Sequence, residues 1–144
     1  SYDLNPDAIP LLLKNLASKG VASSEESCAG LNHTSDGHFV GLADALTLAD
    51  DVRLNGNYDL LLMNLPHDTI QHLPSLLPLL SKENPTLLRG WVVLEEEEIP
   101  TQEGRLAEII ASRNPEEARP RLEIRRQYNA TKVLTRFEVI LGIE

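Results

Sequence analysis

The sequence predicts an α/β fold with a Rossmann-like open sheet, mostly parallel with an antiparallel C-terminal edge, in three α/β/α layers. Three observations support this fold class. Predicted strands and helices alternate along most of the chain, as they do in parallel sheets. Two of the strands are continuous apolar runs, which is typical of strands buried on both faces. The last two runs alternate apolar and polar residues, which predicts an antiparallel pair.

The first half of the chain contains one clear helix and one short strand. The helix follows residues 5–7 and ends at Gly20, because a capping residue, a proline in the first turn and a terminal glycine enclose leucines at helical spacing. Residues 21–37 are rich in Ser, Gly, Asn and acidic residues, which predicts a surface loop. Residues 38–45 form a strand candidate, and residues 46–54 a short helix or turn.

The second half contains the remaining predicted elements. In chain order these are a buried strand over 58–66, a helix that Asp68 can cap and that Pro74 and Pro78 shorten, a buried strand over 87–94, a helix over 102–112, and an antiparallel pair over 121–128 and 132–143. The 144 residues suffice for one domain at most.

Charge and composition exclude several classes of protein. With 13 basic and 22 acidic residues the net charge is −9, which argues against a protein that coats nucleic acid unaided. A local basic stretch is a weak candidate for RNA contact, although a solvated edge is the commoner role of such residues: Arg119, Arg121, Arg125 and Arg126. No apolar run is long enough to span a membrane. The single cysteine, Cys28, cannot form an internal disulfide, which favours an intracellular compartment, cytoplasmic or organellar.

Three predicted strand ends carry polar residues, and ligands of open parallel sheets bind beyond the carboxyl ends of the strands. Asp3 is placed to accept both hydroxyls of a ribose, and Asp44 to accept from an exocyclic amine. At Asn64-Leu65-Pro66-His67, a side-chain amide and backbone carbonyls can bind a flat, nitrogen-rich edge. The alternatives are structural, because Asp3 and Asp44 can cap the following helices and Asn64–Pro66 can be a plain strand exit.

Other chemistry has little support in the sequence. The four histidines show no metal-ligand spacing, and no metal site is expected. No phosphate-binding loop and no Gly-x-Ser-x-Gly elbow occurs. The acidic run Glu95–Glu98 follows a predicted strand, where a solvated acidic exit is the usual interpretation.

The residues at these strand ends resemble a known family. The matching segments are Asp3-Leu4-Asn5-Pro6-Asp7-Ala8 before a leucine-rich helix, Asp44-Ala45, and Tyr58-Asp59 leading into Met63-Asn64-Leu65-Pro66. Together they resemble the class I S-adenosylmethionine-dependent methyltransferases. Asn64-Leu65-Pro66 ends the predicted strand over 58–66, which corresponds to the fourth strand of this class. An Asn-Leu-Pro at that place resembles the archaeal and eukaryotic tRNA guanine-N1 methyltransferases. The resemblance covers residues 1 to about 100 in order.

The resemblance implies a role for each matched position. The residues implied to bind S-adenosylmethionine are Asp3, Leu4, Asn5, Asp44, Ala45 and Asn64. Asn64 and Pro66 are implied to orient the target base. The donor's sulfonium makes the methyl electrophilic, so the protein mainly positions two reactants and removes one proton. His67 is the candidate acceptor of that proton, with Asp68 as the alternative.

The chain departs from the family pattern at one point. The class has a first strand and a glycine-rich turn upstream of the position of Asp3, and no Gly-x-Gly occurs here. We therefore expect a single partial domain over residues 1–144 that lacks its first strand and binds the cofactor poorly alone, with the missing part supplied by another segment or subunit. The alternatives are a noncatalytic methyltransferase-like module that binds RNA or a protein partner, and a small α/β domain of unrelated activity.

Overall fold

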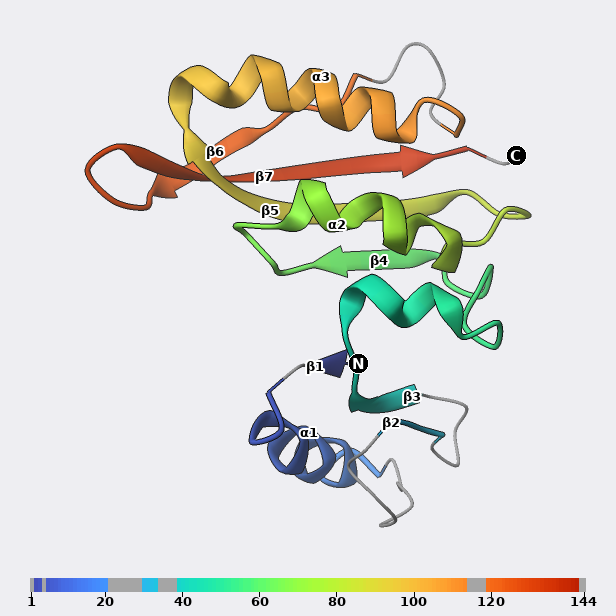
Figure 1. Ribbon diagram of the computed structural model, residues 1–144. Coiled ribbons are helices and arrows are strands. Elements are labelled where there is room, and N and C mark those ends of the chain that lie inside the picture. The colour runs from blue at the N-terminus through green and yellow to red at the C-terminus, as the bar shows by residue number, and fades with distance from the viewer. Residues whose placement is uncertain (1, 4, 21–29, 34–38, 114–118, 143–144) are drawn as a thin grey trace. The chain divides into compact units, whose positions relative to one another are not determined.

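The computed structural model describes residues 2–3, 5–20, 30–33, 39–113 and 119–142 (Figure 1). The chain divides into two compact units, Ser1–Leu48 and Ala49–Glu144, and each is considered by itself. Leu4 and Cys28 lie outside the described residues. The prediction of one partial domain over the whole chain stays a prediction.

The first unit contains a small mixed sheet and one helix. Its elements are β1 (Tyr2–Asp3), α1 (Ala8–Ala17), β2 (Gly30–His33) and β3 (Phe39–Leu42). The strand order is β1-β3-β2, with β1 parallel and β2 antiparallel to β3. The predicted helix and the strand before Asp44 are confirmed. The loop predicted over 21–37 is wrong at β2, because cross-strand pairing with β3 outweighs the polar composition of that segment.

The second unit is a four-stranded sheet with two α-helices. After the short 3₁₀ helix η1 (Ala45–Asp50), which spans the division, its elements are β4 (Leu60–Met63), α2 (Thr69–Leu76), η2 (Leu77–Leu79), β5 (Thr86–Glu95), η3 (Glu96–Glu98), α3 (Ile99–Ile110), β6 (Glu123–Gln127) and β7 (Lys132–Leu141). The strand order is β4-β5-β7-β6. β4 and β5 are parallel, while β7 is antiparallel to β5 and to β6. The Rossmann-like open sheet with an antiparallel C-terminal edge is thereby confirmed.

The core of this unit lies on one face of its sheet. Along β7 the odd-numbered residues from Val133 to Leu141 are buried, and the residues between them are half-buried or exposed. The register pairs Phe137 with Gly90 of β5, and Thr69 at the start of α2 lies against the same position. α3 contributes Leu106 and Ile110 to the core. The two helices contact each other, and α2 contacts β5.

β4 differs from its sequence prediction. The apolar run over 58–66 predicts burial on both faces, but Leu60 and Leu62 are 48% and 54% exposed while Met63 is 2% exposed. Within the described part of this unit, β4 pairs with β5 and with no second strand, and the face that carries Leu60 and Leu62 is left largely exposed. Hydrophobicity alone therefore overstates the burial of this strand, because burial depends on what covers each face.

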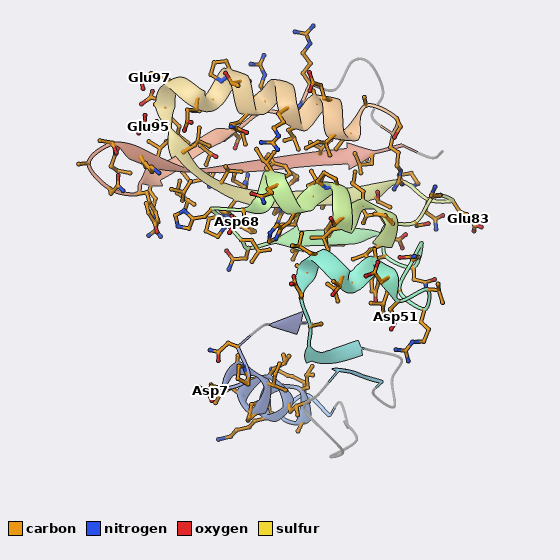
Figure 2. The ribbon with its side chains drawn as sticks, viewed as in Figure 1. Asp7, Asp51, Asp68, Glu83, Glu95 and Glu97 are labelled. Atoms are coloured by element: carbon orange, nitrogen blue, oxygen red, sulfur yellow. The ribbon has the colours of Figure 1, made fainter. Side chains whose placement is uncertain are left out.

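α2 begins after Asp68, which Figure 2 labels beside the helix. The Asp68 side chain makes no capping hydrogen bond. Its backbone N–H instead donates to the Leu65 carbonyl at 2.8 Å. Pro74 lies inside the helix, which ends at Leu76 and continues as η2. Among the described helices, none has the length and apolar character to cross a membrane.

Candidate functional site

The parallel pair β1–β3 brings two of the predicted cofactor-binding residues, Asp3 and Asp44, to one edge of the small sheet. The register places Asp3 opposite Leu42, so both strands end together. Asp44 follows β3 by two residues, and Asn5 follows β1 by two. The backbone thus places Asp3 at the carboxyl end of β1, and Asn5 and Asp44 just beyond the ends of two neighbouring parallel strands, where ligands of such sheets bind.

Asp44 and Asn5 also stabilise the turns that follow the strands. The Asp44 Oδ1 accepts a hydrogen bond from the Leu46 backbone N–H at 2.9 Å, which confirms the predicted capping role. The Asn5 Oδ1 accepts from the Asp7 N–H at 3.0 Å. Asp44 is half-buried, and within the described residues its Oδ2 makes no hydrogen bond. A capping role therefore leaves one carboxylate oxygen of Asp44 available to a ligand.

The Asn64-Leu65-Pro66 segment follows the carboxyl end of β4 and is held by its own carbonyls. The Leu65 carbonyl accepts from the Asp68 N–H and from the Thr69 hydroxyl, each at 2.8 Å. The Pro66 carbonyl accepts from the Val93 N–H of β5 at 2.7 Å. The Leu65 and Pro66 carbonyls therefore fix the loop, and the expectation that backbone carbonyls bind a substrate edge stays a prediction for the other carbonyls of this segment.

Asn64, at the start of this segment, remains a candidate ligand-binding residue. Its side chain is exposed and makes no hydrogen bond within the described residues. A primary amide presents two N–H donors and a carbonyl acceptor, which suits the edge of a nucleobase.

His67 contacts Tyr128, a residue for which the sequence predicts no role at the site. The His67 Nε2 and the Tyr128 Oη lie 3.3 Å apart, and the two rings pack edge to face with centroids 5.7 Å apart. Tyr128 directly follows β6, so the contact joins the loop after β4 to the hairpin β6–β7. The sequence alone does not predict this contact, because His67 and Tyr128 are brought together only by the folded sheet.

The predicted RNA-contacting arginines differ in how many acidic partners they have. Arg121 lies 3.7 Å from a Glu103 oxygen, and Arg125 lies 3.6 Å from a Glu123 oxygen. Arg126 and Arg119 are exposed and form no ion pair within the described part of the chain. The basic character of this edge therefore rests mainly on two of the four residues.

No protein-family model and no curated protein sequence matches the chain. The crystal structure of M. jannaschii TYW2 in complex with AdoMet is similar over 99% of this chain, with a TM-score of 0.70 and 14% sequence identity. The likeness shows the fold. This chain spans 57% of the length of that protein.

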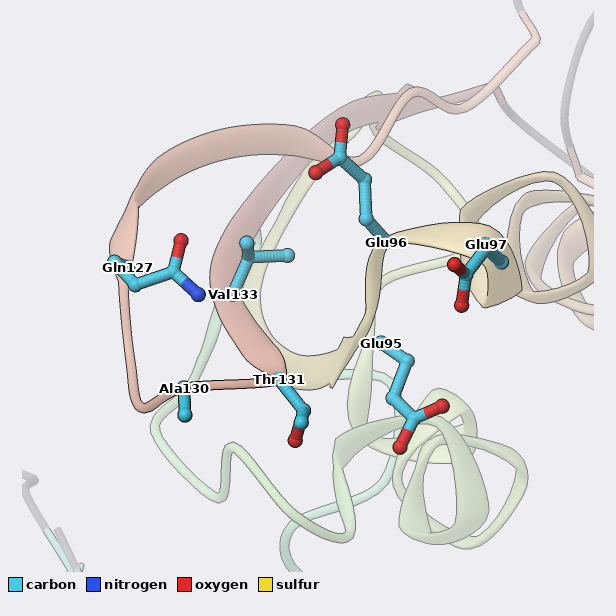
Figure 3. A pocket seen from close by; sticks show the side chains of 7 residues that line it. All are labelled: Glu95, Glu96, Glu97, Gln127, Ala130, Thr131 and Val133. Atoms are coloured by element: carbon cyan, nitrogen blue, oxygen red, sulfur yellow. The ribbon is translucent and has the colours of Figure 1, made fainter.

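An open hollow of about 350 Å³ lies at the carboxyl end of β5 (Figure 3). Its lining is formed by Glu95, Glu96, Glu97, Gln127, Ala130, Thr131 and Val133. Glu95 and Glu98 form a reciprocal capping box at the start of η3, with the Glu95 N–H donating to Glu98 Oε2 at 2.9 Å. The acidic run thus has a structural role, and its charge disfavours an RNA phosphate at this end of the sheet.

The described residues hold no cluster of three His, Cys, Asp or Glu side chains that could bind a metal ion. The predicted site is divided between the two units. Asp3, Asn5, Asp44 and Ala45 belong to the first, whereas Asn64, Pro66 and His67 belong to the second.

Proposed function

We propose that this chain is the cofactor-binding and catalytic part of an S-adenosylmethionine-dependent RNA methyltransferase that acts on a tRNA base, guanine. The observation that carries the proposal is the register of β1 and β3, by which Asp3 is the last residue of one strand and Asp44 follows the carboxyl end of its parallel partner. The likeness to a protein crystallised with AdoMet supports the choice of cofactor. The family resemblance of Asn64-Leu65-Pro66 supports the choice of a tRNA base.

The residues at this edge fit the proposed cofactor. The free Oδ2 of Asp44 can accept from an adenine amine while Oδ1 keeps its capping hydrogen bond. We assign the ribose hydroxyls to Asp3, the last residue of the strand that pairs with β3. The cofactor, when bound, supplies an electrophilic methyl group. The exposed amide of Asn64 then orients the target base, and His67 accepts its proton.

The cofactor assignment is tested by adding S-adenosylmethionine to the ¹⁵N-labelled chain. Because weak binding is expected, the titration extends to about 5 mM S-adenosylmethionine. This range detects a binding free energy as small as ~4 kcal/mol, which corresponds to a dissociation constant of about 1 mM. We expect the Ala45 and Leu46 amide signals to shift. Asp44→Asn retains the oxygen that caps Leu46 but loses the acceptor for the amine, so these shifts should disappear.

Asp50→Asn is the matched control, because Asp50 is exposed on the same short helix. It should leave the ligand-induced shifts unchanged. Equal responses in the Asp44 and Asp50 variants, or no response at Ala45 and Leu46 in the unaltered chain, would reject the adenine assignment.

RNA is proposed to bind through the basic edge at β6, with Arg126 as the main cation. Removing one cation that pairs with a phosphate should lower the slope of log affinity against log salt by about one. Arg126→Ala should do so for a tRNA transcript in filter binding. Arg105→Ala, which removes an exposed charge from α3, should not. Equal salt slopes for both variants would contradict a phosphate path at β6.

We also propose that another segment or subunit supplies the strand and glycine-rich turn that the family pattern contains. Its support is the unpaired side of β4 within the second unit, next to the exposed Leu60 and Leu62. A strand added there would extend the parallel part of the sheet.

A noncatalytic module that binds RNA or a protein is the second candidate. The observation in its favour is that the Leu65 and Pro66 carbonyls are engaged inside the fold, so fewer groups face a substrate. Transfer of a labelled methyl group to total tRNA separates the two functions. Cofactor binding without any transfer, in the presence of the completing segment, would favour the noncatalytic module.

A further inference from the structure

His67 and Tyr128 are brought together by two firmly held segments. The loop that carries His67 is fixed by the Pro66 carbonyl, which accepts from β5, and by the two hydrogen bonds to the Leu65 carbonyl. The residues are 61 positions apart in the sequence, so their contact depends on the packing of the sheet and not on local geometry.

The hairpin that carries Tyr128 is equally constrained. The Tyr128 N–H donates to the Lys132 carbonyl at 2.8 Å. Asn129 closes the turn, because its Oδ1 accepts from the backbone N–H groups of Thr131 and Lys132 at 3.0 and 2.8 Å. The hydroxyl of Tyr128 has no other hydrogen bond within the described residues, so His67 is its protein partner there.

We propose that Tyr128 is a positioning residue that holds His67 in its Nε2–H tautomer, with the hydroxyl oxygen accepting that proton's hydrogen bond. This proposal rests on the proposed methyl transfer. A neutral imidazole has one donor and one acceptor nitrogen, and the partner of one nitrogen decides which role the other has. If the hydroxyl instead donated to Nε2, the ring would carry its proton on Nδ1 and no basic nitrogen would remain for a substrate. With Nε2–H bound to Tyr128, Nδ1 keeps a free lone pair.

In this arrangement His67 can take up the proton that the methyl transfer releases. The lone pair of the target nitrogen forms the new N–C bond, the C–S bond of the donor breaks, and its electron pair remains on sulfur. The proton of the target nitrogen passes to Nδ1 of His67. The resulting imidazolium retains its Nε2–H hydrogen bond to Tyr128, so the ring does not have to reorient.

The test reads the tautomer directly and needs no substrate. The chain is labelled with ¹⁵N at histidine, and the ring nitrogens of His67 are observed at about pH 8, where imidazoles are largely neutral. We expect Nε2 to be protonated in the unaltered chain. Tyr128→Phe keeps the ring contact but removes the hydroxyl, so the Nδ1–H fraction should rise. Tyr58→Phe, a hydroxyl removed elsewhere, should leave the His67 signals unchanged.

If the contact between the two rings is only structural, Tyr128→Phe should leave the His67 tautomer unchanged. A predominantly Nδ1–H ring in the unaltered chain would also overturn the proposal. In the methyl-transfer assay, loss of one neutral hydrogen bond should lower kcat by about 3- to 10-fold with KM for the donor unchanged. Unchanged kcat in Tyr128→Phe would contradict the positioning role.

The failure of this proposal is distinguishable from the failure of the proposed function. A chain that transfers methyl groups but holds His67 as Nδ1–H refutes the role of Tyr128 alone. A chain that transfers no methyl group in the presence of the completing segment refutes the proposed function, and the role of the pair with it.

Discussion

Gly90 is packed so closely in the core that it leaves no room for a side chain. A Cβ at this position would lie 2.6 Å from Cε1 and Cζ of Phe137 and 3.0 Å from Cγ2 of Thr69. The Phe137 ring is fully buried and cannot move aside cheaply. We therefore expect Gly90→Ala to lower the free energy of unfolding by about 1–3 kcal/mol, measured in urea by the fluorescence of Trp91, the single tryptophan.

The matched control is Gly104→Ala in the middle of α3. Nothing lies within 4 Å of a Cβ there, and the position is exposed. Because alanine is the better helix former, this change should raise the free energy of unfolding by ~0.5–1 kcal/mol. If both substitutions shift stability in the same direction, the close packing of Gly90 against Phe137 is refuted.

Asp51 is the residue whose titration should depart from its ordinary range. Side-chain hydrogen bonds from the Arg53 guanidinium, at 2.9 Å from Nε, hold the pKa of Asp51 below 3.8. Since the folded pKa is the lower one, the pair stabilises the fold above about pH 3.8, and this contribution is lost as the pH falls through the folded pKa. Carboxyl ¹³C NMR checks the midpoint. Arg53→Leu should raise it towards 3.8, and an unchanged midpoint would show that Arg53 does not cause the low pKa.

At the scale of single elements, β4 carries an exposed apolar side that the four-stranded unit does not use. Leu62→Lys should change the free energy of unfolding of the chain by no more than ~0.5 kcal/mol, because the side chain is already half-exposed. Met63→Lys is the contrasting variant on the same strand. It would bury an unpaired charge at a fully buried site and should be strongly destabilising. Equal costs for the two would show that Leu62 is covered in the chain.

The elements that the sequence predicts well are those specified by local chemistry. The helix after residues 5–7, the strand around 87–94 and the final antiparallel pair each follow from period and from turn residues. β2 is missed because its polar residues carry no strand signal, and its pairing with β3 is tertiary. The half-exposure of β4 is missed for a similar reason, since an apolar run does not reveal which face a helix will cover.

The candidate site follows the same division between local and distant interactions. The cap at Asp44 is predictable, because its acceptor and the Leu46 N–H are two residues apart. The engagement of the Pro66 carbonyl with Val93 and the contact of His67 with Tyr128 join segments far apart in the sequence. Such contacts depend on strand order and register, which periodicity does not specify.

At the scale of the whole molecule, most of the described core lies within residues 49–144, where β5 and β7 pair along ten residues and α2 contacts β5. Ile9 and Leu48 are the buried apolar residues in the described part of the first unit. We expect residues 49–144 alone to unfold in urea with the same Trp91 midpoint and slope as the whole chain, because each unit is compact by itself. This fragment should nevertheless show no response to S-adenosylmethionine, since it lacks Asp3 and Asp44. A lowered midpoint would show that residues 1–48 stabilise the larger unit. A response of the fragment to the cofactor would move the proposed binding site from the β1–β3 edge to the loop after β4.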